Sequence, residues 1–297
     1  MNRKLLTICG ALWLGLAPAV ATAQTALAAP TIPIVQTSDR LSQQRMDALV
    51  SRPLAIVRLQ GLPAGRAAFA RRLATARTAH GARSTEVADL LTSFGVALYS
   101  LGLESGDRAL QEASIPYLDA AIPAYRTAFG NAHPEVAVAL NAYADAQSAL
   151  HEEDPPQSAE AALEEAYRIR LSAFGPTNVE TLASLRYLAR IKGLPSRIHG
   201  NHVRMAAVVD LYRLLIANSP SDPRMGYFTA PYGRAALAGM YARNGMVAEA
   251  REQLRLAIEQ TQGWDEADQC TFAYETNEVE RLLAGNSEPL WETFACR

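Results

Sequence analysis

Two histidines spaced three residues apart, His199 and His202, come nearest to a metal-binding motif in this sequence. On one face of a helix such a pair could ligate a metal ion, but the sequence singles out no third ligand, so two loop histidines at the start of a helix are the simpler interpretation. The sequence contains no His-Glu-Xaa-Xaa-His motif, no glycine-rich phosphate loop with lysine and no Gly-Xaa-Ser-Xaa-Gly turn. We therefore predict that the protein is not an enzyme and needs neither a metal nor a cofactor.

Residues 1–23 have the three parts of a secretory signal peptide. Two positive charges within Met1–Lys4 precede the apolar run Leu5–Leu16, and Ala21-Thr22-Ala23 is a cleavage site of small residues. The apolar run is shorter than the roughly 20 residues that a membrane-spanning helix needs, and an uncleaved anchor is the alternative. We therefore expect cleavage after Ala23, a periplasmic or secreted protein, and no membrane insertion of the mature chain.

Two cysteines, Cys270 and Cys296, remain after this cleavage. An even number of cysteines in an exported chain predicts a disulfide, whereas two unlinked buried thiols are the alternative. The bond would close a loop of about 25 residues and stabilise the fold by about 3 kcal/mol if chain entropy decides its contribution.

The charge of the mature chain is mild. Loss of Arg3 and Lys4 leaves 26 basic against 30 acidic residues, a net charge of −4. This total gives no basic footprint for nucleic acid and no polybasic patch for a membrane.

A pattern of small and large residues recurs four times, every 45 to 49 residues, with the spacing of a two-helix hairpin. In the second helix of each hairpin the pattern predicts these inward-facing residues: Ala113, Tyr117 and Ala120; Ala159, Leu163 and Ala166; Ala207, Leu211 and Leu214; Ala250, Leu254 and Ala257. Because one hairpin cannot bury its apolar face alone, such units stack into an array. Extra residues between the paired helices of three copies leave the helix boundaries open.

The linkers between the copies carry a family resemblance. The run Phe129-Gly130-Asn131-Ala132-His133-Pro134, followed by Leu140-Asn141, is the clearest; Phe174–Leu182 is a degenerate copy and Gly81–Val87 a weaker one. Over roughly residues 81–260 the chain resembles the tetratricopeptide-repeat (TPR) family, in its kinesin-light-chain-like form. The resemblance implies an all-α, right-handed superhelical array of about four helix hairpins, with N-terminal helices and a C-terminal cap.

In this family the first helix of each pair lines a concave groove that holds an extended peptide. Transferred position by position, the resemblance implies six peptide-binding residues: Thr92, Asn141, Asp145, Arg186, Arg190 and Arg243. Tyr99 could also reach into the groove. Arg186 and Arg190 lie at i and i+4, so together they could hold a carboxylate, although a solvated basic face near the acids of the next repeat is the alternative.

The chain divides by composition and pattern into four parts. After the signal peptide, residues 24–60 are expected to form a linker and a short helix from Ser38 to about Val50, ended by Pro53. The array spans 61–262 and begins with a helix from Ala64 to Ala79. Residues 263–297 form a cap with a helix from about Glu275 to Leu283, pinned by the disulfide.

The first of these array helices also carries four arginines, Arg66, Arg71, Arg72 and Arg77. We interpret them as a solvated face, with partner binding as the alternative.

These features favour a non-enzymatic interaction module or scaffold of the bacterial periplasm or envelope, which binds a protein or peptide of unknown identity in the groove. A self-assembling structural component of the envelope is one alternative. A metal-dependent enzyme with a site built from the loops between repeats, such as the one around His199, is the other.

Overall fold

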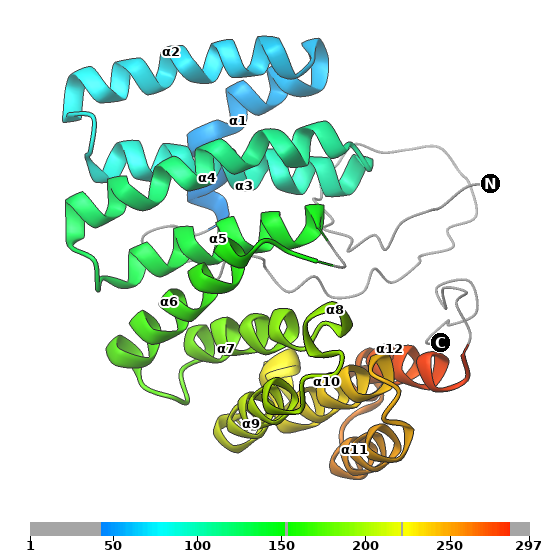
Figure 1. Cartoon of the computed structure of the whole chain (residues 1–297). Helices are drawn as coiled ribbons and strands as arrows, with labels where there is room; N and C mark the ends of the chain where they lie inside the picture. The colour runs from blue at the N-terminus through cyan, green and yellow to red at the C-terminus, as the bar shows by residue number, and fades with distance from the viewer. Residues whose placement is uncertain (1–42, 152–153, 221, 286–297) are drawn as a thin grey trace, which may run out of the picture. The chain divides into compact units, whose positions relative to one another are not determined.

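The computed structural model describes residues 43–151, 154–220 and 222–285, and these residues form twelve α-helices, one 3-10 helix and no strand (Figure 1). The predicted all-α class is therefore confirmed. The chain divides into two compact units, with the division between Arg197 and Ile198. The predicted signal peptide and linker lie outside the described residues.

The N-terminal unit contains seven long helices: α1 (Gln43–Gln60), α2 (Leu62–His80), α3 (Thr85–Ser105), α4 (Arg108–Phe129), α5 (Pro134–Leu150), α6 (Gln157–Phe174) and α7 (Val179–Lys192). From α3 onward each of these helices packs against the next one along the chain, so that α3 with α4 and α5 with α6 form the predicted pairs. The short α8 (Pro195–Ile198) spans the division.

The C-terminal unit contains α9 (His202–Asn218), the 3-10 helix η1 (Pro223–Phe228), α10 (Ala230–Arg243), α11 (Val247–Gln260) and α12 (Glu266–Leu283). Here α10 is central, because α9, α11 and α12 all pack against it. Tyr232 of α10 forms the centre of an aromatic cluster, with the ring of Phe272 edge-on at 5.0 Å and that of Trp264 at 6.3 Å. The division between the units falls inside the third predicted pair, since α7 and α9 belong to different units.

The corners before α3, α5 and α7 share one geometry. Each begins with a glycine at positive φ, which favours glycine, and the amide of that glycine bonds to the carbonyl four residues earlier: Gly81 (91°), Gly130 (89°) and Gly175 (79°). Three residues after each glycine a side chain caps the next helix by accepting a backbone N–H: Ser84, His133 and Asn178. The ring of His133 also stacks on Phe129 at 4.3 Å, which gives this histidine a structural role.

The inward face of the second helices was predicted correctly for two pairs. The three predicted residues of α6, centred on Leu163, and the three of α11, centred on Leu254, are all buried. In α4 and α9 the prediction was wrong by one residue. The buried residues are Ser114, Leu118 and Ala121 in α4, and Val208, Tyr212 and Leu215 in α9, while Leu214 is 40% exposed.

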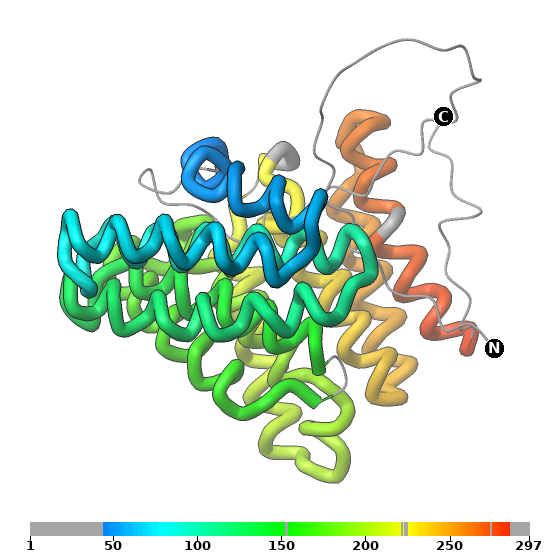
Figure 2. Tube along the Cα trace, turned by 90° about the horizontal axis from the view of Figure 1, so that it is seen from above, coloured from blue at the N-terminus to red at the C-terminus, as the bar shows by residue number. Residues whose placement is uncertain are grey.

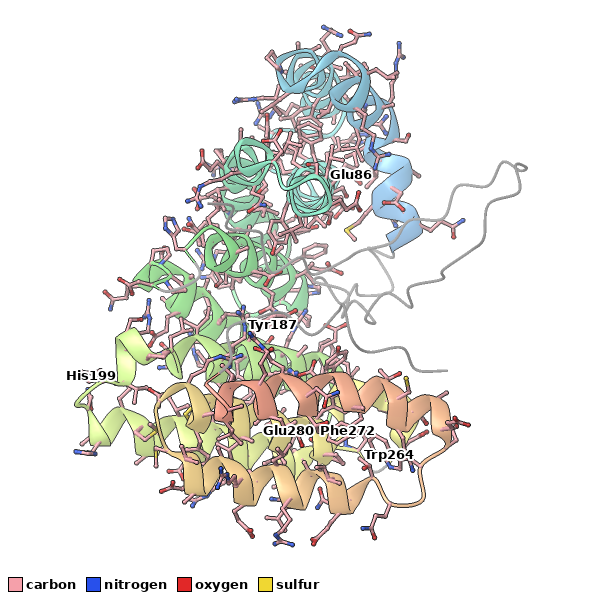
Figure 3. All side chains as sticks on the ribbon, turned by 90° about the vertical axis from the view of Figure 1, so that its right-hand side faces the viewer. Glu86, Tyr187, His199, Trp264, Phe272 and Glu280 are labelled. Atoms are coloured by element: carbon pink, nitrogen blue, oxygen red, sulfur yellow. The ribbon has the colours of Figure 1, made fainter. Side chains whose placement is uncertain are left out.

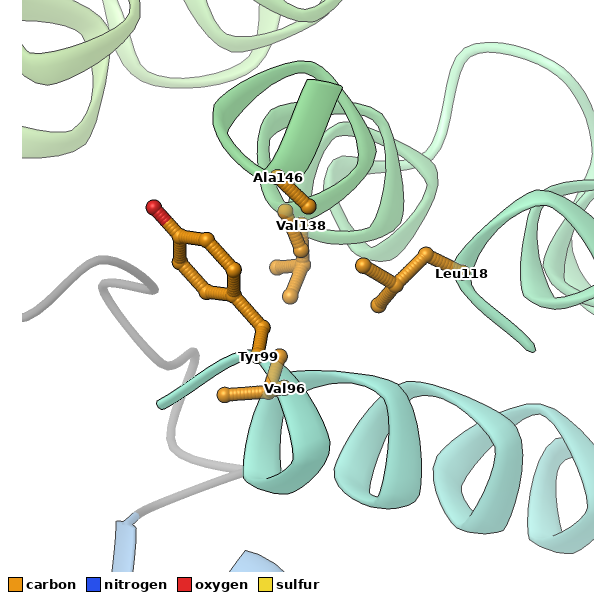
Figure 4. Close-up of a cluster of buried hydrophobic side chains, with 6 residues drawn as sticks. Val96, Tyr99, Leu118, Val138 and Ala146 are labelled. Carbon is orange, nitrogen blue, oxygen red and sulfur yellow. The ribbon is translucent and has the colours of Figure 1, made fainter. Parts of the chain in front are cut away.

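This shift has a local cause in α4. Leu118 packs directly over Gly95 of α3, where an added Cβ atom would lie only 2.6 Å from the Leu118 side chain. The close approach at a glycine fixes which face of α4 turns inward. Around it, Leu118 forms an apolar cluster with Val96 and Tyr99 of α3 and Val138 of α5 (Figure 4).

The N-terminal helix was predicted too short. Pro53 does not end α1, which continues to Gln60 and changes direction part-way along (Figures 1 and 2). A proline inside a helix removes one hydrogen bond and bends it, and here the burial of Met46, Val50 and Val57 compensates. The helix packs against both α2 and α3, and its first half passes α3 on the side away from α4.

One further boundary differs from the sequence prediction. The last helix, α12, begins at Glu266 rather than near Glu275, because Asp265 caps it by accepting the backbone N–H of Asp268 at 2.8 Å. Helix α3 is long and apolar enough to span a membrane, but most of its apolar stretch is buried inside the N-terminal unit.

Candidate functional site

The structure places five of the six predicted peptide-binding residues in the N-terminal unit. Thr92 lies on α3, Asn141 and Asp145 on α5, and Arg186 and Arg190 on α7. Arg243 is the last residue of α10, in the C-terminal unit, and is exposed. The candidate site is therefore the face that α3, α5 and α7 form with these five residues, hereafter the α3–α5–α7 face.

Two of the five residues are closed to a partner. Thr92 is fully buried and Asn141 is 5% exposed. Asn141 exchanges hydrogen bonds with the Ser184 hydroxyl of α7 at 3.0 and 3.3 Å, so its side-chain amide links α5 to α7. These two residues are therefore buried behind the face and do not line it.

A buried arginine that the sequence analysis missed completes this support. Arg170 of α6 is 1% exposed, donates to the Ser184 hydroxyl at 2.9 Å, and forms an ion pair with Glu180 at 3.2 Å. Burial lowers the pKa of Arg170, and the charge of Glu180 opposes this shift. Arg170 follows Ala166 by four residues, so its position on the predicted inward face of α6 was a signal that could have found it.

The α3 end of the face is covered by the chain itself. Helix α1 packs against α3, and Arg45 reaches the buried carboxylate of Asp89 at 3.7 Å. The other carboxylate oxygen of Asp89 accepts a hydrogen bond from the Tyr125 hydroxyl at 2.9 Å. Since Asp89 precedes Thr92 by one helical turn, α1 lies where the predicted groove would begin.

The face is open at Arg190, which lies in a cluster of four side chains from three helices: Tyr99, Asp145, Tyr187 and Arg190. Tyr99 and Asp145 are buried, and Tyr187 is partly exposed. The Arg190 guanidinium lies 5.7 Å from the centre of the Tyr187 ring, a cation–π contact, and 3.9 Å from one oxygen of Asp145. The side chain of Arg190 is 50% exposed, so its remaining donors face solvent. The hydroxyl of Tyr99 points away from α3 (Figure 4).

Asp145 is the least satisfied group of this cluster. It is 9% exposed, and its second carboxylate oxygen has no hydrogen-bond partner among the described residues. Burial raises the pKa of Asp145 to about 6, and the Arg190 charge and a polar contact with Tyr99 only partly offset this shift. Below that pH Asp145 becomes neutral and Arg190 loses the attraction that holds it against the face.

The two tyrosines respond to the same carboxylate. Burial raises the pKa of Tyr99 and of Tyr187, and the charge of Asp145 raises both further. Both therefore stay neutral hydrogen-bonding groups. Tyr99 was predicted to reach into the groove, whereas Tyr187 was not predicted. The position of Tyr187 one turn before Arg190 was a signal that could have found it.

The other candidates for chemistry lie apart from this face. His199 lies in the turn after α8, whereas His202 is the first residue of α9, so the two do not share a helix as the metal interpretation required (Figure 3). No group of three or more potential metal ligands occurs among the residues that the structure describes. Cys270 lies on α12, but Cys296 is outside the described residues, and their pairing stays a prediction.

No family model matches this chain, and no curated protein matches it either. The resemblance to TPR proteins therefore stays a prediction, and the case for function depends on the geometry described above.

Proposed function

We propose that this protein is a non-enzymatic interaction module of the bacterial periplasm or envelope, which holds a segment of a partner protein on the α3–α5–α7 face. The observation that carries the proposal is the convergence of Tyr99, Asp145, Tyr187 and Arg190 from three helices. Arginine and tyrosine are among the residue types that contribute most binding energy at protein interfaces.

The covering of α3 by α1 supports the same use of the face. Met46 and Val50 of α1 are almost fully buried, and Arg45 pairs with Asp89, so a helical segment docks there through apolar contacts and one ion pair. A partner segment on α5 and α7 would instead meet Arg190 as the charged contact and the partly exposed ring of Tyr187 beside it.

The proposal includes the finer fold assignment, a right-handed TPR-like superhelical array. Small-angle X-ray scattering of the mature protein is the test. A superhelical array gives an elongated particle with one fixed profile, whereas two independently moving units give a profile that only an ensemble can fit.

Photo-crosslinking tests where the partner binds. A photoreactive amino acid replaces the partly exposed Arg186 of α7 in one protein and the exposed Arg168 of α6 in another, and each is irradiated in the envelope fraction. We expect one partner band with the probe at position 186 and none at 168. The same band should be lost when Arg190→Glu is added to the position-186 protein and kept when Arg168→Glu is added.

Equal crosslinking from both positions would place the partner elsewhere and contradict the proposal, as would a band that survives Arg190→Glu. Circular dichroism of each variant ensures that loss of the band reflects loss of contact and not loss of fold.

A further inference from the structure

The charges of this chain are strongly segregated. Residues 43–83, which contain α1 and α2, carry eight arginines and one acid, Asp47; residues 84–285 carry 16 basic and 26 acidic residues. The mild net charge of the whole chain therefore hides a basic helical hairpin, defined here as residues 43–83. In Figure 1 its second helix, α2, forms one edge of the N-terminal unit.

Six of the eight arginines are available to a partner. The exceptions are Arg45, which pairs with Asp89, and Arg66, which donates to the Tyr117 hydroxyl at 3.2 Å. The six exposed side chains make no hydrogen bond or ion pair with other described residues: Arg52, Arg58, Arg71, Arg72, Arg77 and Arg83. Several exposed arginines elsewhere are neutralised locally, as Arg255 is by Glu252 and Glu259.

Between its arginines, α2 exposes small side chains. The exposed positions of α2 between Arg66 and Arg77 are otherwise small, among them Ala70, Ala74 and Thr75. Apart from arginine, the large side chains that usually anchor a protein interface, tyrosine and tryptophan, are absent from the exposed positions of α2. Its charge is spread over the hairpin, which suits an extended anionic surface better than a single acidic segment.

One apolar side chain accompanies the charge. Leu59 follows Arg58 near the turn between α1 and α2 and is 83% exposed, the most exposed large apolar residue described. Peripheral membrane proteins combine basic residues, which meet lipid phosphates, with apolar side chains, which enter the interface. The guanidinium group also fits phosphate oxygens through two parallel hydrogen bonds.

We propose that the basic helical hairpin is a docking surface for an anionic lipid bilayer. The arginines of α2 and of the α1–α2 turn would contact the lipid phosphates, and Leu59 would enter the headgroup layer. The protein would then be held at a membrane surface without a spanning segment. This inference is independent of the proposed function, because none of its residues belongs to the α3–α5–α7 face.

Sedimentation with vesicles tests the inference. The mature protein is mixed with vesicles of phosphatidylglycerol and phosphatidylcholine in equal parts, or of phosphatidylcholine alone. We expect binding to the anionic vesicles only, and its loss when salt rises from about 0.05 M to about 0.5 M, since salt screens such contacts.

The variant Arg71→Gln/Arg72→Gln/Arg77→Gln should bind about a hundredfold more weakly, because each arginine near an anionic surface contributes roughly a fivefold factor. The matched control Arg168→Gln/Arg213→Gln/Arg251→Gln removes three exposed arginines outside the hairpin and should keep the wild-type affinity. A conservative variant with lysine at 71, 72 and 77 should keep most of the binding, and Leu59→Ser should lose part of it.

Three results would overturn the inference. The first is equal binding to both kinds of vesicle, the second an equal loss in the two glutamine variants, and the third no vesicle binding at all. In the third case, binding of a hexaglutamate peptide by wild type, but not by the Arg71→Gln/Arg72→Gln/Arg77→Gln variant, would assign the hairpin to an acidic protein instead. Retained helicity of each variant is checked by circular dichroism.

Discussion

Two neighbouring helix pairs of the N-terminal unit bury a polar side chain with different chemistry. They are the α3–α4 pair, hereafter the aromatic layer, and the α5–α6 pair, hereafter the polar layer. Tyr125 of α4 and Arg170 of α6 both lie four residues before the end of their helix, and both are almost fully buried. Tyr125 donates one hydrogen bond to Asp89, whereas Arg170 carries a full charge that needs Glu180 and Ser184. The two layers thus share one corner geometry but differ in the partners that their buried polar groups require.

The difference extends to the surroundings of each residue. The first layer adds aromatic packing, with Phe69 and Phe94 stacked at 4.0 Å and Tyr117 edge-on to both. The second layer adds polar groups, Asn141 and Asp145, and leads outward to Arg190. We infer that the aromatic layer serves stability, whereas the polar layer positions the open part of the α3–α5–α7 face.

The largest effect should come from Arg170. Arg170→Ala leaves Glu180 without its buried partner and should lower the free energy of unfolding by about 3–5 kcal/mol. Tyr125→Phe removes only a hydroxyl and should cost about 1–3 kcal/mol. Urea unfolding followed by circular dichroism measures both, with the exposed Arg168→Ala as a control near zero. Equal losses for Arg170→Ala and Tyr125→Phe would contradict the distinction between the layers.

A second effect concerns glycines at helix contacts. At Gly95 an added Cβ would lie 2.6 Å from Leu118, whereas at Gly239 of α10 the nearest atoms would be at ordinary contact distances of 3.5 and 3.7 Å. Gly95→Val should therefore cost about 3 kcal/mol through overpacking. Gly239→Ala should stabilise the protein by about 0.5–1 kcal/mol, because alanine favours the helix.

Thermal unfolding of both glycine variants checks these two effects. The variant Gly95→Ala adds a side chain of intermediate size at the first position. A neutral Gly95→Val would mean that α3 and α4 can separate at no cost, and the aromatic layer would then be looser than its packing indicates.

Local patterns were predictable from the sequence, whereas the buried face of the second helix was predicted in two of the four pairs, α6 and α11. The corners at Gly130 and Gly175 follow from a glycine and a capping residue three positions later, which act within one turn of chain. The register of α4 depends on where Leu118 meets Gly95 on another helix, and the extra residues between them concealed it. Pro53 predicts a helix end from its residue type. The helix α1 continues through it because the burial of apolar side chains against other helices compensates for the bend, which the local sequence does not reveal.

The candidate site shows the same limit. The pattern placed Asn141, Asp145 and Arg190 on one face, and in the structure Arg190 lies 3.9 Å from Asp145. Their role in binding stays a prediction. Whether each is open depends on neighbours that the spacing does not reveal: Ser184 occupies Asn141, and α1 covers α3 near Thr92. The role of Arg170 is also set by contacts, because arginine is usually solvated and its residue type gives no sign of burial.

Asp145 separates the polar layer from the aromatic layer by its response to pH. Its pKa is raised from the ordinary 3.8 to about 6. A raised pKa means that the folded state binds the proton more tightly, so the stabilisation is complete below about pH 3.8 and is lost as the pH rises through 6. The free energy of unfolding should thus gain about 1.4 kcal/mol between pH 7 and pH 5 from this residue.

Comparison with Asp145→Asn isolates that contribution, because all other titrating groups are shared. The variant should be less sensitive to pH between 5 and 7 by this amount, measured by urea unfolding at each pH. Parallel curves for the two proteins would show that Asp145 is solvated, and the cluster around Arg190 would then be more open than described.

The smallest effect should come from the ion pair between Arg45 and Asp89, which joins α1 to the aromatic layer. Arg45 is 51% exposed and its guanidinium is 3.7 Å from the carboxylate, so Arg45→Ala should cost only about 0.5 kcal/mol. Asp89 keeps the Tyr125 hydroxyl, and the burial of Met46 and Val50 keeps α1 in place. Hydrogen exchange of the α1 amides in Arg45→Ala should therefore remain close to wild type. Rapid exchange confined to α1 would instead show that one charge holds this helix over α3, and the covered end of the face would then be as open to a partner as the α5–α7 end.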